Sequence, residues 1–145
     1  MTVTLSDTAR QYIALFEDET GATARDCVVL DGDGGDEKRV VFVVKPGDMG
    51  RAIGPGGKHV RGVQDRLDAD VELIEDADTA AGFVANALAP AEVRHVTISE
   101  NDDIVAYVEV AQEDTGVAIG AGGRNIETAK LIVDRHFDVD DIQLT

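Results

Sequence analysis

One eight-residue segment occurs twice in this chain and constrains its fold more than any other feature. The first copy, residues 53–60, reads Ile-Gly-Pro-Gly-Gly-Lys-His-Val, and the second, residues 119–126, reads Ile-Gly-Ala-Gly-Gly-Arg-Asn-Ile. Four of the eight positions are identical, and a fifth exchanges Lys for Arg. A repeat at this distance in a chain of 145 residues predicts two copies of one folding unit.

An amphipathic helix is predicted well before each Gly-rich segment, because apolar residues there are spaced i, i+3, i+4 and i+7. These residues are Ala9, Tyr12, Ile13 and Phe16 in the first copy and Ala80, Phe83, Val84 and Ala87 in the second. Ser6 is the predicted N-cap of the first helix, and Asp78 or Thr79 that of the second. Gly21 and Pro90 mark the predicted helix ends.

Two apolar runs and one segment of alternating apolar and polar residues predict three strands in each copy. The apolar runs are residues 27–30 and 40–44 in the first copy and residues 93–98 and 104–110 in the second, and the alternating segments are residues 71–73 and 137–139. A turn rich in Gly, Asp or Asn is expected after residues 27–30 and after residues 93–98. The unit is therefore helix, strand, strand, helix, Gly loop, helix, strand, which is an α/β (α+β) fold. We predict one domain at residues 1–77 and a second at residues 78–145.

The Gly-rich segments suit a surface that a ligand approaches closely. Gly54, Gly56 and Gly57 permit positive φ and carry no Cβ. The helix predicted to begin near Gly57 presents unpaired amide groups that suit a phosphate oxygen. The apolar residues that flank the two loops are expected to anchor them in the core, and they are Ile53, Val60, Ile119 and Ile126.

Nucleotide-binding motifs and catalytic pairs are not supported by the spacing of residues. A Walker A loop requires Gly where Ala52 stands and a hydroxyl where His59 stands, and a dinucleotide fingerprint requires Gly in place of His59. The adjacent acids Asp102 and Asp103, like Asp140 and Asp141, would point to opposite faces of a strand. We therefore expect no enzymatic activity.

The two Gly loops resemble those of the KH family of RNA-binding domains. The family signature is Ile-Gly-x-x-Gly-x-x-Ile/Val between two helices and after a strand, and both copies match it. The helix and strand that precede this core are similar to the type II form of the domain. Two such domains in tandem resemble archaeal NusA-like transcription termination/antitermination factors, and the resemblance covers residues 1–145.

This resemblance implies that each domain is a helix-covered three-stranded mixed sheet and that each GXXG loop holds the backbone of about four nucleotides of single-stranded RNA. The residues that it assigns to RNA binding lie in and beside the two loops. They are Arg51, Gly54, Pro55, Gly56, Gly57, Lys58, His59, Arg61, Gly120, Ala121, Gly122, Gly123, Arg124 and Asn125. No cofactor is implied.

The charge of the chain is distributed unevenly. The chain has 29 acidic and 13 basic residues, a formal net charge of -16. Residues 45–66 hold five basic and two acidic residues, whereas residues 67–112 hold one basic and eleven acidic ones, and residues 113–135 have a net charge of -1. We therefore expect the first domain to supply most of the electrostatic affinity for RNA and the second to contribute mainly shape.

The composition is also biased within each charge sign. Asp outnumbers Glu by 19 to 10, Arg outnumbers Lys by 9 to 4, and Trp is absent. Such a composition is typical of halophilic proteins, in which molar salt shortens the Debye length to about 3 Å and screens the repulsion among acidic side chains. The acidic surface thus indicates a salt-rich solvent.

Several classes of protein are disfavoured by simple counts. Cys27 is the only cysteine, which excludes an intrachain disulfide, and His59, His95 and His136 lack the spacing of a zinc site. No long apolar run or secretory signal occurs. We expect a cytoplasmic protein that does not bind membranes or metal ions.

Two alternatives to a role in transcription remain open. The same domains would serve in ribosome assembly or RNA processing, or the KH scaffold would serve as a protein-interaction adaptor. RNA polymerase is a candidate protein partner, through the acidic residues 67–112. The sequence does not distinguish termination from antitermination, and it reveals neither an RNA sequence preference nor an oligomeric state.

Overall fold

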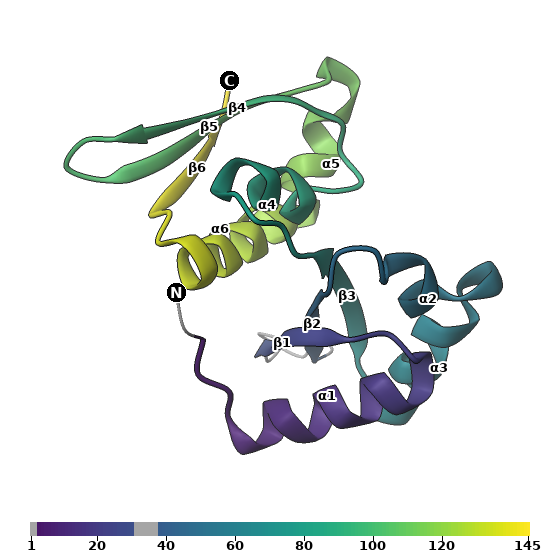
Figure 1. Cartoon of the computed structure of the whole chain (residues 1–145). Coiled ribbons are helices and arrows are strands. Elements are labelled where there is room, and N and C mark those ends of the chain that lie inside the picture. The colour runs from purple at the N-terminus through teal and green to yellow at the C-terminus, as the bar shows by residue number, and fades with distance from the viewer. Residues whose placement is uncertain (1–2, 31–37) are drawn as a thin grey trace. The chain divides into compact units, whose positions relative to one another are not determined.

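The computed structural model describes residues 3–30 and 38–145, so most of the turn predicted after residues 27–30 lies outside the described part of the chain. The first half contains α1 (Asp7–Thr20), β1 (Ala24–Leu30), β2 (Arg39–Val44), α2 (Met49–Ile53), α3 (Lys58–Leu67) and β3 (Asp70–Glu75). The second half contains α4 (Ala80–Ala87), β4 (Val93–Glu100), β5 (Ile104–Val110), α5 (Thr115–Ile119), α6 (Arg124–Phe137) and β6 (Asp141–Leu144). The predicted order of elements and the α+β class are confirmed (Figure 1).

The chain divides into two compact units, one formed by Thr4–Asp76 and the other containing Ala77–Thr145. Each unit has one three-stranded mixed sheet with its second strand in the centre. In the first unit β1 pairs antiparallel with β2, and β2 pairs parallel with β3. In the second unit β4, β5 and β6 repeat this pattern. The parallel pair requires a crossover connection, and the two helices on either side of each Gly loop form it.

The helix α1 covers the first sheet with its apolar face. The hydroxyl of Ser6 accepts a hydrogen bond from the Ala9 N–H at 3.1 Å and so caps the helix, and Gly21 ends it with a φ of 73°. Both positions confirm the predictions. The buried Phe16 stacks on Phe42 of β2, with ring centroids 4.5 Å apart. This aromatic pair lies in the core of the first unit.

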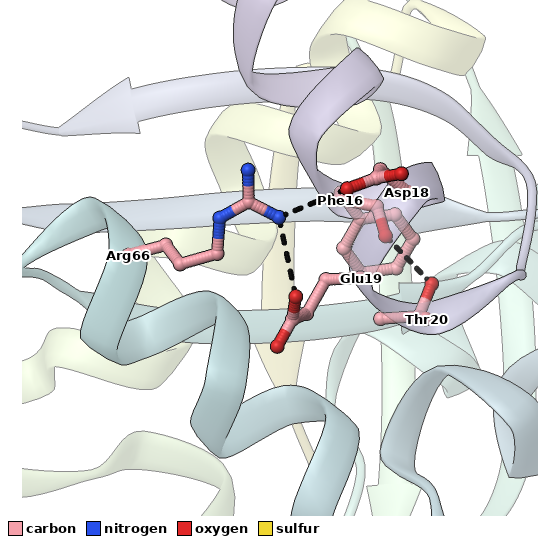
Figure 2. Close-up of polar contacts among 5 residues, drawn as sticks. All are labelled: Phe16, Asp18, Glu19, Thr20 and Arg66. Carbon is pink, nitrogen blue, oxygen red and sulfur yellow. Dashed lines mark hydrogen bonds and ion pairs between the residues drawn. The ribbon is translucent and has the colours of Figure 1, made fainter.

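Polar contacts join α1 to α3 at the edge of this core. Arg66 of α3 donates hydrogen bonds to the carboxylates of Asp18 and Glu19, both at 3.2 Å (Figure 2). These hydrogen bonds raise the pKa of Arg66 above its ordinary value. The Thr20 hydroxyl donates to the Phe16 carbonyl at 2.8 Å in a buried position. Because the Arg66 ion pairs are open to solvent, they contribute little to stability.

In the second unit α4 takes the place of α1. The Thr79 hydroxyl accepts a hydrogen bond from the Gly82 N–H at 3.1 Å, so Thr79 is the N-cap and Asp78 is not. Phe83 is fully buried, and its ring centroid lies 5.2 Å from that of Phe137 in α6. The two halves thus use the same plan, in which an N-terminal helix supplies an aromatic residue to the core.

The closing strand of the second unit differs from the prediction. The sequence pattern predicts a strand at residues 137–139, but Phe137 ends α6 and β6 begins at Asp141. The reason is that α6 has 14 residues whereas α3 has 10, about one helical turn fewer. Asp138 then ends α6 with a φ of 56°, as Asp68 ends α3 with a φ of 50°. The prediction was wrong because it carried the spacing of the first copy through a longer helix.

An ion pair joins α6 to the closing strand. The ammonium of Lys130 lies 3.2 Å from the Asp141 carboxylate. Burial raises the pKa of Asp141, but hydrogen bonds from Lys130 and Gln143 act in the opposite direction and bring the pKa below its ordinary value of 3.8. The hydrogen bond to Asp141 in turn raises the pKa of Lys130 above 10.5. The pair therefore stabilises the fold until the pH falls through the lowered pKa or rises through the raised one.

We expect Asp141→Asn to lower the free energy of unfolding by at most about 1 kcal/mol, because the pair is partly exposed. The loss should be constant from about pH 5 to about pH 9, since neither partner titrates in that range. Denaturant unfolding at fixed salt measures it, and Asp102→Asn, at an exposed position, is the control. A difference that changes with pH inside this range would contradict the assignment.

No helix among the described residues is both long and apolar enough to cross a membrane.

Candidate nucleic-acid interface

The two Gly loops have the same backbone conformation. Each consists of a glycine after a five-residue helix, then a short 3₁₀ turn, and then a longer helix. The 3₁₀ turns are Pro55–Gly57 and Ala121–Gly123. The corresponding φ angles are 75° and 77° at Gly54 and Gly120, 59° and 64° at Gly56 and Gly122, and 80° and 81° at Gly57 and Gly123. All these angles lie in the left-handed region, where glycine is favoured.

The apex of each loop is open. A Cβ built on Gly56 or on Gly122 would meet no atom within 4 Å, and both residues are exposed. At Gly54 the situation is different, because a Cβ there would lie 2.5 Å from the Cγ of His59. At Gly120 it would lie 2.8 Å from the Cγ of Asn125. The first glycine of each loop is thus required by close packing within the protein, whereas the apex glycine leaves room for a ligand.

Cationic side chains stand directly after the loops, at the start of the following helices. Lys58 begins α3 and Arg124 begins α6, and both are exposed. The N-cap residues of these helices, Gly57 and Gly123, make no side-chain capping hydrogen bond. The amides of Gly57, Lys58, Gly123 and Arg124 donate to carbonyls within the turns. The positive end of each helix dipole nevertheless lies beside a basic side chain, which suits an anionic group.

Two further predicted residues of the first loop contact the protein itself. A guanidinium nitrogen of Arg61 donates to the Gly56 carbonyl at 2.7 Å, and one of Arg51 donates to the Gly21 carbonyl at 3.3 Å. The Arg61 side chain thus keeps its charge at the loop, whereas the Arg51 guanidinium is held at the end of α1. In the second copy the position of Arg61 is held by Glu127, so the charge beside the loop is reversed.

His59 and Asn125, which were also predicted to bind RNA, point back toward the preceding helices. The Nδ1 atom of His59 lies 2.7 Å from the Arg51 carbonyl oxygen. The side-chain amide of Asn125 donates to the Val117 carbonyl at 2.8 Å. The structure therefore places these two side chains in contacts within each loop region.

The prediction that Ile53 and Ile119 anchor the loops in the core is wrong. Ile53 is 41% exposed and Ile119 is 38% exposed, whereas Val60 and Ile126 are partly buried. Five-residue helices turn only one narrow face to the core, and the buried positions on them are the neighbouring Ala52 and Ala118. Each loop is consequently entered from a helix that displays an apolar side chain to solvent.

Asp48 and Asp114 occupy the same position in the two copies of the repeat, and the structure shows what they do. The Asp48 carboxylate accepts a hydrogen bond from the Thr23 N–H at 2.9 Å, and the Asp114 carboxylate accepts one from the Glu92 N–H at 2.8 Å. Each aspartate thus ties the start of the short helix to the chain just before the first strand. The recurrence of an aspartate at this position in both copies was the sequence signal that could have indicated this role.

No group of three His, Cys, Asp or Glu side chains that could hold a metal ion occurs within residues 3–30 and 38–145.

Comparisons with known proteins agree with this arrangement. A family model described as "KH domain" matches residues 10–79, and one described as "NusA-like second KH domain" matches residues 80–145. The crystal structure of APE1850 is similar with a TM-score of 0.83 at 27% identity, over 97% of this chain and 100% of that chain.

Several relatives bear one name. "Probable transcription termination protein NusA" of Halobacterium salinarum is 61% identical over 100% of both chains, and its namesake of Halococcus morrhuae is 59% identical over 99% of both. The namesake of Methanococcus vannielii is 38% identical over 91% of this chain and 73% of its own. With identity at this level across its whole length, the chain belongs to the NusA family and consists of two KH domains.

Proposed function

We propose that this protein binds single-stranded RNA and acts as a transcription termination or antitermination factor, with one Gly loop of each domain holding the RNA backbone. The observation that carries the proposal is the shared conformation of the two loops, each with an open glycine at its apex. A phosphate oxygen at that apex would meet the positive end of a helix dipole and the exposed cation of Lys58 or Arg124. Two equivalent sites on one chain suit a polymer with a repeating phosphate.

Exposed apolar residues beside the loops support the binding of bases. Ile53, Val117 and Ile119 are about two-fifths exposed, with values of 41%, 41% and 38%. They lie on the short helices α2 and α5 that lead into the loops. Unstacked bases of single-stranded RNA have apolar faces that would cover such side chains, while paired bases in a duplex are not available.

The transcriptional role is supported by the names of the full-length relatives, which are called probable transcription termination proteins. We therefore favour nascent RNA as the ligand and RNA polymerase as the protein partner, in the cytoplasm, over ribosome assembly, RNA processing or a purely protein-binding adaptor. The two RNA-binding domains would be residues 1–77 and 78–145. The chemistry at the loops is binding without catalysis.

Binding of fluorescent single-stranded RNA, with DNA of the same sequence as the comparison, tests this function. We expect saturable binding that prefers RNA and weakens as salt rises, with a logarithmic slope of about -0.7 for each phosphate contact. The double variant Gly56→Asp, Gly122→Asp should lose more than about tenfold in affinity, because two carboxylates would repel the backbone. Asp tolerates the left-handed conformation, and both apices are free of steric contact.

A charge-matched control separates the loops from the general effect of added acid. Gln11→Glu with Asn101→Asp adds the same two negative charges at exposed positions on α1 and on the turn between β4 and β5, and it should bind like the unmodified protein. A folded protein that binds no RNA at any salt concentration would refute the function. Equal losses in the loop variant and the control would refute the role of the loops.

A further inference from the structure

A side chain from the second residue of each long helix bonds to the short helix on the other side of the Gly loop. In the first domain His59 Nδ1 lies 2.7 Å from the Arg51 carbonyl oxygen, and in the second domain Asn125 Nδ2 lies 2.8 Å from the Val117 carbonyl oxygen. The two donors differ in chemical type but occupy the same position of the repeat. Because two different side chains make the same kind of contact, we infer that both loops require a donor at this carbonyl.

The two carbonyl groups need a donor because of where their helices end. The last four carbonyls of any helix have no intrahelical partner. For Arg51 the residue four positions later is Pro55, which has no N–H to donate. For Val117 that residue is Ala121, which follows the turn of the chain at Gly120. The side chains of His59 and Asn125 supply the missing donor in each case.

The first glycine of each loop makes space for this bond. A Cβ on Gly54 would lie 2.5 Å from the His59 Cγ and 2.9 Å from the His59 backbone nitrogen. A Cβ on Gly120 would lie 2.8 Å from the Asn125 Cγ and 2.9 Å from the Asn125 backbone nitrogen. The bonding side chain therefore lies against the glycine Cα, on the protein side of the loop.

We infer that His59 and Asn125 are positioning residues, which hold the two helices around each Gly loop so that the loop amides are ordered before RNA arrives. This inference rests on the proposed RNA binding for its effect on affinity. Neither side chain needs to touch RNA for this role. A loop that is already ordered loses less conformational entropy when it binds, and the affinity rises accordingly.

Removal and exchange of the two side chains test the inference. His59→Ala and Asn125→Ala remove the bond, whereas His59→Asn and Asn125→His exchange one donor for the other. RNA affinity is measured for each domain alone by placing Gly→Asp at the apex of the other loop. Amide hydrogen exchange of Gly54, Gly56, Gly57 and residues 120–123 is measured in the free protein, and thermal unfolding reports stability. His95→Ala and Asn101→Ala, at exposed positions away from both loops, are the controls.

We expect each alanine variant to lose about fivefold in RNA affinity, the worth of one hydrogen bond, and to exchange its loop amides faster without RNA. The exchanged donors should restore both quantities, and the controls should change neither. Gly54→Ala, which displaces the His59 ring, should speed exchange like His59→Ala.

Three outcomes would overturn the inference. The first is an alanine variant with normal affinity and normal exchange. The second is a loss of affinity with unchanged exchange in the free protein, which would indicate a direct RNA contact. The third is a failure of the exchanged donors to restore the loop. If the unmodified protein binds no RNA, the proposed function fails, but the exchange data still decide whether the loops are held in this way.

Discussion

Transfer from molar salt to about 0.1 M salt is expected to unfold this protein, and return to molar salt is expected to refold it. The chain has 29 acidic and 13 basic residues, so one-to-one pairing would leave 16 acids without a partner. The Debye length grows from about 3 Å to about 10 Å over this change in salt, and repulsion among the acids then acts across the surface.

Small domains are vulnerable to this repulsion because their stability is low. Each unit has its own small core, and a domain of this size is typically stable by only about 5 kcal/mol. Repulsion of a few kcal/mol therefore suffices to unfold it. Relatives at 61% and 59% identity come from the halophilic archaea Halobacterium salinarum and Halococcus morrhuae, which agrees with an acidic surface suited to high salt.

Far-ultraviolet circular dichroism during dialysis measures the transition. Sucrose at low salt is the control for general stabilisation by a solute, because it favours compact states without screening charge. The triple variant Glu100→Gln, Asp102→Asn, Asp103→Asn reduces the net charge from -16 to -13 at exposed positions, and it should need less salt to fold. Asn101→Gln, in the same turn, should leave the salt midpoint unchanged. An unaltered spectrum at about 0.1 M salt would refute the expectation.

The repeat was sufficient to predict the order of elements, because hydrophobic spacing and the Gly loops recur in one register. It failed where the two copies differ in length. Residues up to Val133 keep the spacing of the first copy, but α6 continues to Phe137. Nothing local marks Asp134 as a helical residue and Asp68 as a helix end, since both are aspartates at the same register position. Whether the helix ends at this position or continues depends on how the following residues pack against the sheet.

Within the loop region, sequence identified the right segment but not the role of each side chain. Ile53 and Ile119 are apolar, which favours a core position, yet the short helices bury the adjacent Ala52 and Ala118 instead. The role of His59 and Asn125 was missed because the acceptor is a backbone carbonyl, which every residue type has. A single copy of the unit therefore shows no sequence motif for this bond. Comparison of the two copies offered a signal, since both positions hold a side chain with a nitrogen donor.

Gly56→Asp is expected to weaken RNA binding more than Gly122→Asp does. Arg51, Lys58 and Arg61 lie at or beside the first loop, where Arg61 bonds directly to the apex carbonyl. At the second loop Arg124 is accompanied by Glu127 in the position of Arg61. An added carboxylate at the first apex thus opposes a larger positive field. We expect a loss of about tenfold for Gly56→Asp and about threefold for Gly122→Asp at the lowest salt that keeps the protein folded.

The salt dependence distinguishes charge from shape as the cause. Electrostatic contributions are screened as salt rises, so the difference between the two variants should shrink toward molar salt. A difference that persists unchanged at high salt would show that the domains differ in the fit of the RNA and not in charge. Equal losses at every salt concentration would refute the asymmetry altogether.

Changing the charge at position 127 tests the cause directly. Glu127→Arg, measured with Gly56→Asp present to silence the first loop, should raise the affinity of the second domain by about threefold to tenfold, because it restores the cation that the first domain has as Arg61. Glu109→Arg makes the same change of charge at an exposed position on β5 and should have a smaller effect. If both substitutions raise the affinity equally, net charge governs binding and the position beside the loop has no special role.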